Sequence, residues 1–81
     1  MPDYRCTYTQ HDTNDSLMEH TVAILAGVSS EAVKLRAGER FGLGDWNPWT
    51  CTADGAFQRT HTPTPERPYR GIITLEPIKK Q

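Results

Sequence analysis

The sequence predicts a small α+β domain: an antiparallel sheet of four to five short strands, with one helix over about residues 17–26 packed on it. Three observations predict this class. Polar and apolar side chains alternate over residues 4–9, and a run of β-forming residues centred on 72–75 predicts a last strand over residues 70–76. Asp54-Gly55 separates two runs of β-forming residues between positions 49 and 61, which is typical of a hairpin. Ser16 precedes Glu19 by three residues, which matches a helix capping box. A chain of 81 residues is expected to form a single domain, residues 1–81.

The first predicted strand covers residues 4–9, where Tyr4, Cys6 and Tyr8 share one face. The polar run HDTND at residues 11–15 is typical of a turn. A helix is then expected over residues 17–26, because apolar residues recur at helical spacing after Ser16. Gly27 suits the left-handed position that ends such a helix. The β-branched residues Val22 and Ile24 leave a strand open as the alternative.

Residues 31–41 are ambiguous. Val33 and Leu35 alternate with charged neighbours, which favours a strand over residues 32–36; as a helix, the segment would place Arg36 in its apolar stripe. Residues 42–49 (GLGDWNPW) read as a loop, and residues 62–68 (TPTPERP) as an extended, Pro-rich connector within the domain. We expect the core to come from the following apolar residues, with some of Tyr4, Cys6 and Cys51: Leu17, Ile24, Leu25, Val33, Leu35, Phe41, Phe57, Ile73 and Leu75.

Composition limits the classes of partner. Nine Lys and Arg residues face ten Asp and Glu residues, so the chain has no general attraction for phosphate or anionic lipid. No run has the length of a transmembrane helix, and the N-terminus lacks the apolar core of a secretory signal. We therefore expect a cytoplasmic protein that does not bind membranes. Cys6 and Cys51 are expected to be buried thiols in that compartment, with a disulfide between them left open.

No chemical motif stands out. The potential metal ligands do not show zinc-site spacing, so we expect neither metal nor cofactor. A cysteine paired with a histidine, with Asp45 to orient it, could act as a nucleophile, but nothing around these residues favours that arrangement. We expect the chain not to be an enzyme.

The leading functional hypothesis is a non-catalytic module that binds another protein. Trp46 and Trp49 flank Asn47-Pro48 in a loop, and two exposed indoles there would make a binding platform. The predicted partner-binding residues are Trp46, Asn47 and Trp49, with Asp54 at the hairpin tip. Small chains of this type often act as adaptors or inhibitors, including those carried by phages and mobile elements. The alternative for the loop is structural, with the indoles packed into the core. The string LGDWNP at residues 43–48 resembles a segment of starch-binding domains, but the flanking strands and the chain length do not follow that family.

A DNA-binding regulator is the alternative function. Residues 19–36 resemble a helix-turn-helix motif, with Ala23 at the small position and Gly27 in the turn. Ser29, Ser30, Lys34 and Arg36 would then be the DNA-binding residues. The segment departs from the motif at Arg36, where an apolar residue is expected, and the chain lacks a second basic cluster for phosphates. The sequence leaves the oligomeric state open.

Overall fold

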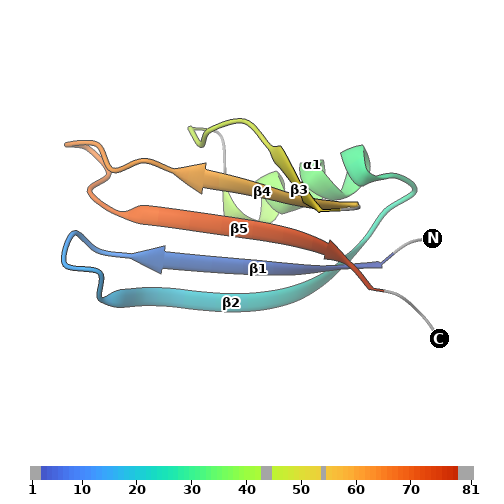
Figure 1. The fold of residues 1–81 in the computed structure, drawn as a ribbon, viewed down its shortest axis with the longest axis horizontal. Helices are drawn as coiled ribbons and strands as arrows, with labels where there is room; N and C mark the ends of the chain where they lie inside the picture. The colour runs from blue at the N-terminus through green and yellow to red at the C-terminus, as the bar shows by residue number, and fades with distance from the viewer. Residues whose placement is uncertain (1–2, 43–44, 54, 79–81) are drawn as a thin grey trace.

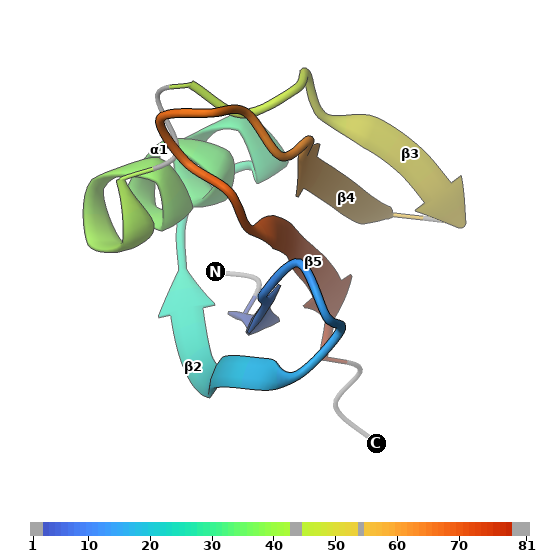
Figure 2. The same cartoon turned by 90° about the vertical axis from the view of Figure 1, so that its left-hand side faces the viewer.

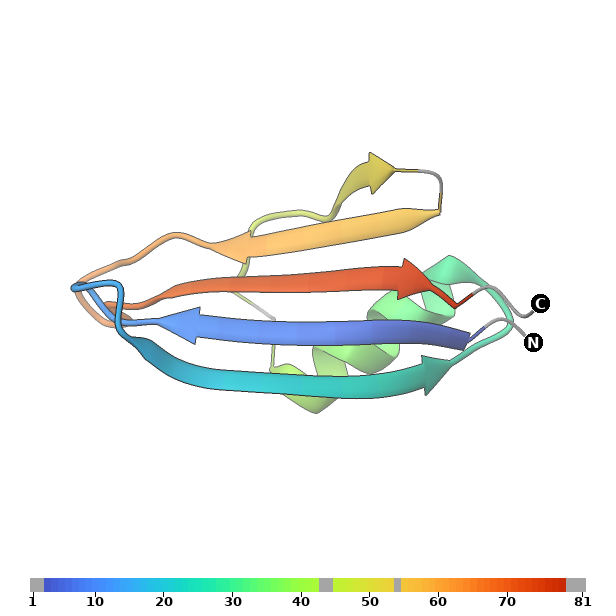
Figure 3. The same cartoon turned by 60° about the horizontal axis from the view of Figure 1, so that its bottom comes forward.

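The computed structural model describes residues 3–42, 45–53 and 55–78. They form one five-stranded antiparallel sheet and a single helix, in the spatial strand order β2-β1-β5-β4-β3 (Figures 1 and 3). This confirms the predicted α+β class. The elements in chain order are β1 (Asp3–His11), β2 (Leu17–Ala26), α1 (Ser30–Phe41), β3 (Thr50–Ala53), β4 (Ala56–His61) and β5 (Arg70–Pro77).

The predicted helix over residues 17–26 is wrong, because this segment is strand β2. It pairs antiparallel with β1 from Asp3 opposite Ala26 to Gln10 opposite Glu19. The capping-box pattern of Ser16 and Glu19 was misleading because Ser16 lies in a turn. Asp12 accepts hydrogen bonds from the amides of Asn14 (2.8 Å) and Ser16 (2.9 Å), so the amide of Ser16 belongs to a hairpin turn. Asp15 takes φ = 62° there, a conformation that Asp tolerates better than most residues.

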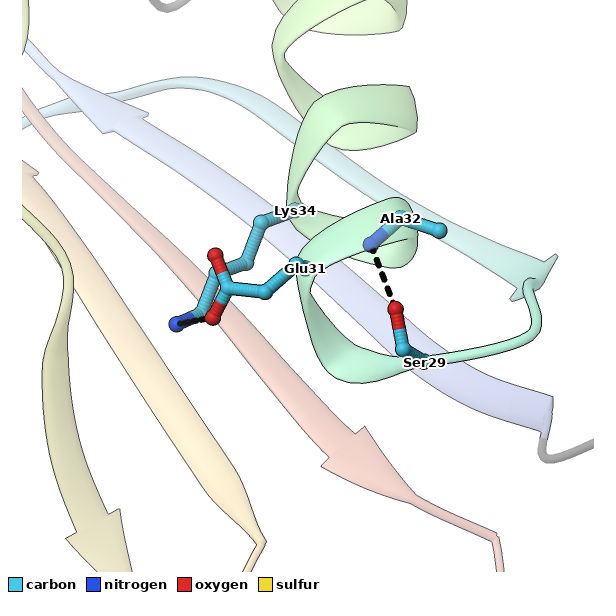
Figure 4. A network of polar contacts seen from close by, with 4 residues as sticks. All are labelled: Ser29, Glu31, Ala32 and Lys34. Carbon is cyan, nitrogen blue, oxygen red and sulfur yellow. Dashed lines mark hydrogen bonds and ion pairs between the residues drawn. The ribbon is translucent and has the colours of Figure 1, made fainter.

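The strand expected over residues 32–36 is also wrong, because residues 30–41 form helix α1. Ser29 is the N-cap: its side-chain oxygen accepts a hydrogen bond from the Ala32 amide at 3.3 Å (Figure 4). Gly42 ends the helix with φ = 64°, the role that had been expected of Gly27. The buried stripe is Val33 and Ala37, one helical turn apart, and Arg36 lies outside it in solvent.

The remaining strand predictions are confirmed. β3 and β4 form the hairpin expected over residues 49–61, although its tip residue Asp54 lies outside the described residues. β5 lies between β1 and β4 and joins the two hairpins into one sheet. The connector over residues 62–68 contains no strand, in agreement with its proline content.

The helix covers one face of the sheet and leaves the other open (Figure 2). Tyr4, Cys6 and Tyr8 of β1 point to the covered face and pack with Ile73 and Leu75 of β5. Of the core predicted from sequence, Val33, Ile73 and Leu75 are buried, together with Tyr4 and Cys6; Leu25, Phe41 and Phe57 are partly buried. Four predicted core residues are exposed instead: Leu17, Ile24, Leu35 and Cys51. Four hydrophobic residues that are buried in the described chain were not in the predicted core list: Tyr8, Ala37, Trp46 and Ala56.

The open face follows from the register. Val22 and Ile24 of β2 lie opposite Thr7 and Arg5 of β1, and all four side chains point away from α1. Ile72 of β5 lies on the same open side, opposite Thr9. The helix is 12 residues long, and among the described residues no helix is both long and apolar enough to cross a membrane.

Candidate functional site

The tryptophan segment, residues 45–49, connects α1 to β3 along the covered side of the sheet. Trp46 is only 6% exposed and lies between Tyr8 and His61, with ring centroids 5.6 and 5.7 Å away. It also covers Gly71 of β5 so closely that a Cβ atom there would lie 2.4 Å from the indole. Trp46 is therefore a core residue, and the two tryptophans do not form one exposed platform.

Asn47 holds the segment in place. Its amide donates to the Thr60 carbonyl (2.9 Å), and its side chain donates to the hydroxyls of Thr60 (3.1 Å) and Thr62 (3.2 Å). Arg59 of β4 adds two bonds from its guanidinium, to the carbonyls of Asn47 (2.5 Å) and Trp46 (3.2 Å). These bonds fix the backbone of residues 46–47, which directly precede Pro48 and Trp49. The predicted partner contact Asn47 thus makes its bonds within the chain.

Trp49 is half-buried and lines a groove of about 470 Å³ between α1 and strand β4. We call this the Trp49 groove. Leu35 stands beside it on α1 with 64% of its surface exposed. The Arg59 guanidinium lies 5.8 Å from the Trp49 ring. The residues that line the groove are Glu31, Lys34, Leu35, Gly38, Glu39, Trp49 and Arg59.

Two of the four charged residues that line the groove, Glu31 and Lys34, form an ion pair with each other. Lys34 contacts the Glu31 carboxylate at 3.1 Å, and its ammonium lies 4.0 Å from the centre of the Phe57 ring (Figure 4 shows the ion pair). Arg59 is bound to the two carbonyls described above. The groove therefore combines an apolar surface with charges of both signs.

Sequence reasoning identified Trp49 but missed the α1 wall of the groove. Glu31, Lys34, Leu35 and Gly38 recur at helical spacing, which is the signal that could have revealed a shared face. A strand interpretation of residues 32–36 does not place these residues on one shared face. The register of the β3–β4 hairpin determines that Arg59 reaches the groove, and no local sequence motif predicts this position.

The helix-turn-helix arrangement does not form, because the segment before the turn is strand β2. The four predicted DNA-binding residues consequently have separate roles. Ser29 caps α1, and Ser30 is its first residue. Lys34 turns toward Phe57 and Glu31, whereas Arg36 is exposed.

A second hollow of about 560 Å³ lies where the β1–β2 turn meets the start of β5. Its charged side chains, Asp15 and Arg70, form an ion pair with each other. His61 is 5% exposed and donates from Nδ1 to the Tyr69 carbonyl at 3.0 Å. Within the described ranges, no three His, Cys, Asp or Glu side chains gather in a way that could bind a metal ion.

Of the two cysteines considered for a nucleophile pair, Cys6 is buried in the core and Cys51 is exposed on β3. Cys6 has no exposed surface, and burial raises the pKa of its thiol from 9.0 to about 11, a rise that the positive charge of Arg40 partly opposes. A thiol with such a pKa is almost entirely protonated at neutral pH, and the thiolate is the reactive form. Asp45, the predicted orienting residue, instead forms an ion pair with Arg67 at 3.1 Å.

No family model, no curated protein and no solved structure matches this chain.

Proposed function

We propose that this chain is a non-catalytic binding module that holds a segment of another protein in the Trp49 groove. One observation carries the proposal: the half-buried indole of Trp49 and the exposed side chain of Leu35 lie together on a fixed frame. Tryptophan is among the residues most enriched at the energetic centres of protein interfaces. An exposed leucine beside it extends the apolar surface that a partner would cover.

The frame supports the proposal because it lowers the cost of binding. Association loses free energy when loops and side chains must be ordered at the interface. Here Asn47 and Arg59 already hold the backbone next to Trp49 through five hydrogen bonds. The mixed and internally paired charges favour a protein segment over a polyanion, since phosphate binding relies on unpaired cations.

Affinity capture with matched variants tests the proposal. The tagged chain would be incubated with an extract of its source cells, and any captured protein would be purified and titrated against each variant. Leu35→Glu and Trp49→Ala are expected to weaken binding about tenfold or more, as for central contacts in interfaces. Val28→Glu is the matched control, because Val28 is 78% exposed but lies outside the groove. Circular dichroism verifies that each variant is folded.

The proposal fails if Leu35→Glu and Val28→Glu bind the captured protein equally well. Duplex DNA, the other partner class suggested by the sequence, can be tested with the same preparation. DNA binding that weakens with salt and is lost in Lys34→Ala and Arg36→Ala would replace the protein-binding proposal.

A further inference from the structure

Strand β2 lies at one edge of the sheet, and no described strand pairs with its outer side (Figure 3). It is the longest described strand, with 10 residues. Its outer backbone groups therefore form a long row of donors and acceptors open to another strand. In the strand order, β1 and β5 lie between β2 and β4, the strand that supplies Arg59 to the Trp49 groove.

The usual protections of an edge strand are missing from β2. Natural edges are blunted by lysines, prolines, bulges or short length. β2 contains neither lysine nor proline, and Glu19 is its only residue with a formal charge at neutral pH. The register shift in the β1–β2 pair falls at the turn end, between Gln10 and His11, so the pairing from Asp3 to Gln10 is regular.

The same strand carries four of the seven large hydrophobic residues that are exposed in the described chain. Leu17 is 61% exposed, Met18 58%, Val22 53% and Ile24 58%. Val22 and Ile24 point to the open face, next to the unpaired edge. A strand added at this edge would bring its own open-face residues against them.

We propose that β2 pairs antiparallel with β2 of a second copy of this chain. A two-fold axis perpendicular to the sheet would join two five-stranded sheets into one, with both helices on the same side. This axis keeps each face on its own side, so the apolar residues of the two open faces meet. One register places Val22 opposite Ile24 of the second copy and Ala23 opposite Ala23.

Charge and shape favour a second copy as the occupant. In this register Glu19 lies opposite Gly27 of the second copy, far from the other Glu19, so no like charges face each other. The apolar pairs match because the strand supplies both members of each pair. The proposal does not rest on the function assigned to the Trp49 groove.

Light scattering coupled to size exclusion, from low micromolar to millimolar concentration, tests the proposal. The wild-type chain is expected to reach twice the 9.1 kDa mass of one chain as concentration rises. Val22→Lys places a charge at the edge and should return the mass to that of one chain. Ile72→Lys is the matched control: Ile72 is exposed on the same open face, but on the central strand β5.

Ile72→Lys should remain dimeric, because edge pairing leaves the centre of the open face uncovered. A wild-type chain that stays at 9.1 kDa throughout would overturn the proposal. Loss of the dimer in Ile72→Lys as well as in Val22→Lys would also overturn it, since that pattern indicates face-to-face stacking of sheets. Hydrogen exchange of wild-type β2 amides provides a test without substitutions: protection should rise with concentration, and unchanged protection would count against edge pairing.

Discussion

The two edges of the sheet are built in opposite ways. β3 has four residues and an irregular register with β4, and the segment before it is held by side-chain bonds to β4. β2 has 10 residues, depends on backbone pairing with β1, and exposes its apolar side chains. The edge formed by β3 is short and irregular, whereas the edge formed by β2 is long and regular.

The large apolar residues therefore have different roles at the two edges. Near β3, the large indole of Trp46 is used to complete the core, and only Trp49 remains partly accessible. Along β2, four large side chains reach solvent without any packing partner in the core cluster. Substitutions near β3 should therefore affect stability, and substitutions on β2 should affect association.

The largest effect is expected from Trp46→Ala, which removes a buried core side chain from the segment that precedes β3. Deleting a buried tryptophan side chain should lower the free energy of unfolding by about 3–5 kcal/mol. Trp49→Ala should cost clearly less, because Trp49 is only half-buried. Urea denaturation followed by circular dichroism measures both. Equal losses in the two variants would show that Trp49 is as much a core residue as Trp46.

Alkaline pH should act on the centre of the sheet, between the two edges. Because the pKa of Cys6 is raised to about 11 in the folded chain, the unfolded chain loses this proton first as pH rises. The stabilisation that comes from the buried, protonated Cys6 thiol is fully present below pH 9. It is lost as the pH rises through 11, which lowers the free energy of unfolding by about 2–3 kcal/mol. Burial also raises the pKa of Tyr8, which acts in the same direction.

Denaturation curves of the wild type and of Cys6→Ala between pH 7 and pH 11 isolate the cysteine contribution. The variant is expected to show a shallower loss of stability over the upper part of this range. Parallel curves for the two proteins would contradict the raised pKa.

Gly71→Ala adds a single methyl group beside Trp46 and so tests how closely the indole packs on β5. Its Cβ would lie 2.4 and 2.6 Å from two atoms of the Trp46 ring, so the indole must move. Overpacking of this kind costs about 1–3 kcal/mol. The double variant Gly71→Ala/Trp46→Ala should lose less than the sum of the two single losses, because the clash disappears with the indole. Additive losses in urea denaturation would show that the two residues do not interact.

The smallest effect is expected at the start of α1. Ser29→Ala removes the cap that accepts the Ala32 amide, which should cost about 1 kcal/mol. Ser29→Asp retains an acceptor and should preserve most of the stability. Since α1 forms one wall of the Trp49 groove but does not pair with the edge of β2, dimerisation should be unchanged. A change in dimer mass on Ser29→Ala would contradict that separation.

Alternation predicted β1, turn chemistry predicted the β3–β4 hairpin, and the run of β-forming residues at 72–75 predicted β5. They failed for β2 and α1, where the predicted helix and strand are exchanged. Ser16 and Glu19 imitate a capping box, but the preceding Asp12 captures the Ser16 amide and the β-branched Val22 and Ile24 favour a strand. Pairing with β1 reaches from Ala26 back to Asp3, beyond the short windows in which helical and strand periodicity are compared.

The groove was even less predictable than the fold. Trp46 and Trp49 have similar local surroundings, yet Trp46 is the one buried, by contacts with residues distant in sequence: Tyr8, His61 and Gly71. The α1 wall could be recognised only once residues 30–41 were known to be helical. Leu17, Ile24 and Leu25 were expected to share one face of a helix, but in strand β2 Leu17 and Ile24 are exposed and only Leu25 packs partly against the core.

The place of β5 in the sheet has a consequence for the order of folding. β1 pairs with β5 from Tyr4 opposite Pro77 to His11 opposite Arg70, so the central pairing joins segments from nearly opposite ends of the described chain. During synthesis the two hairpins would emerge separately, and the ribosome must release β5 before they can be united. Closing so large a loop costs entropy before any contact compensates for it, which slows folding. Until then β1 and β4 are edges as well, and the growing chain displays more unpaired strand than the finished protein.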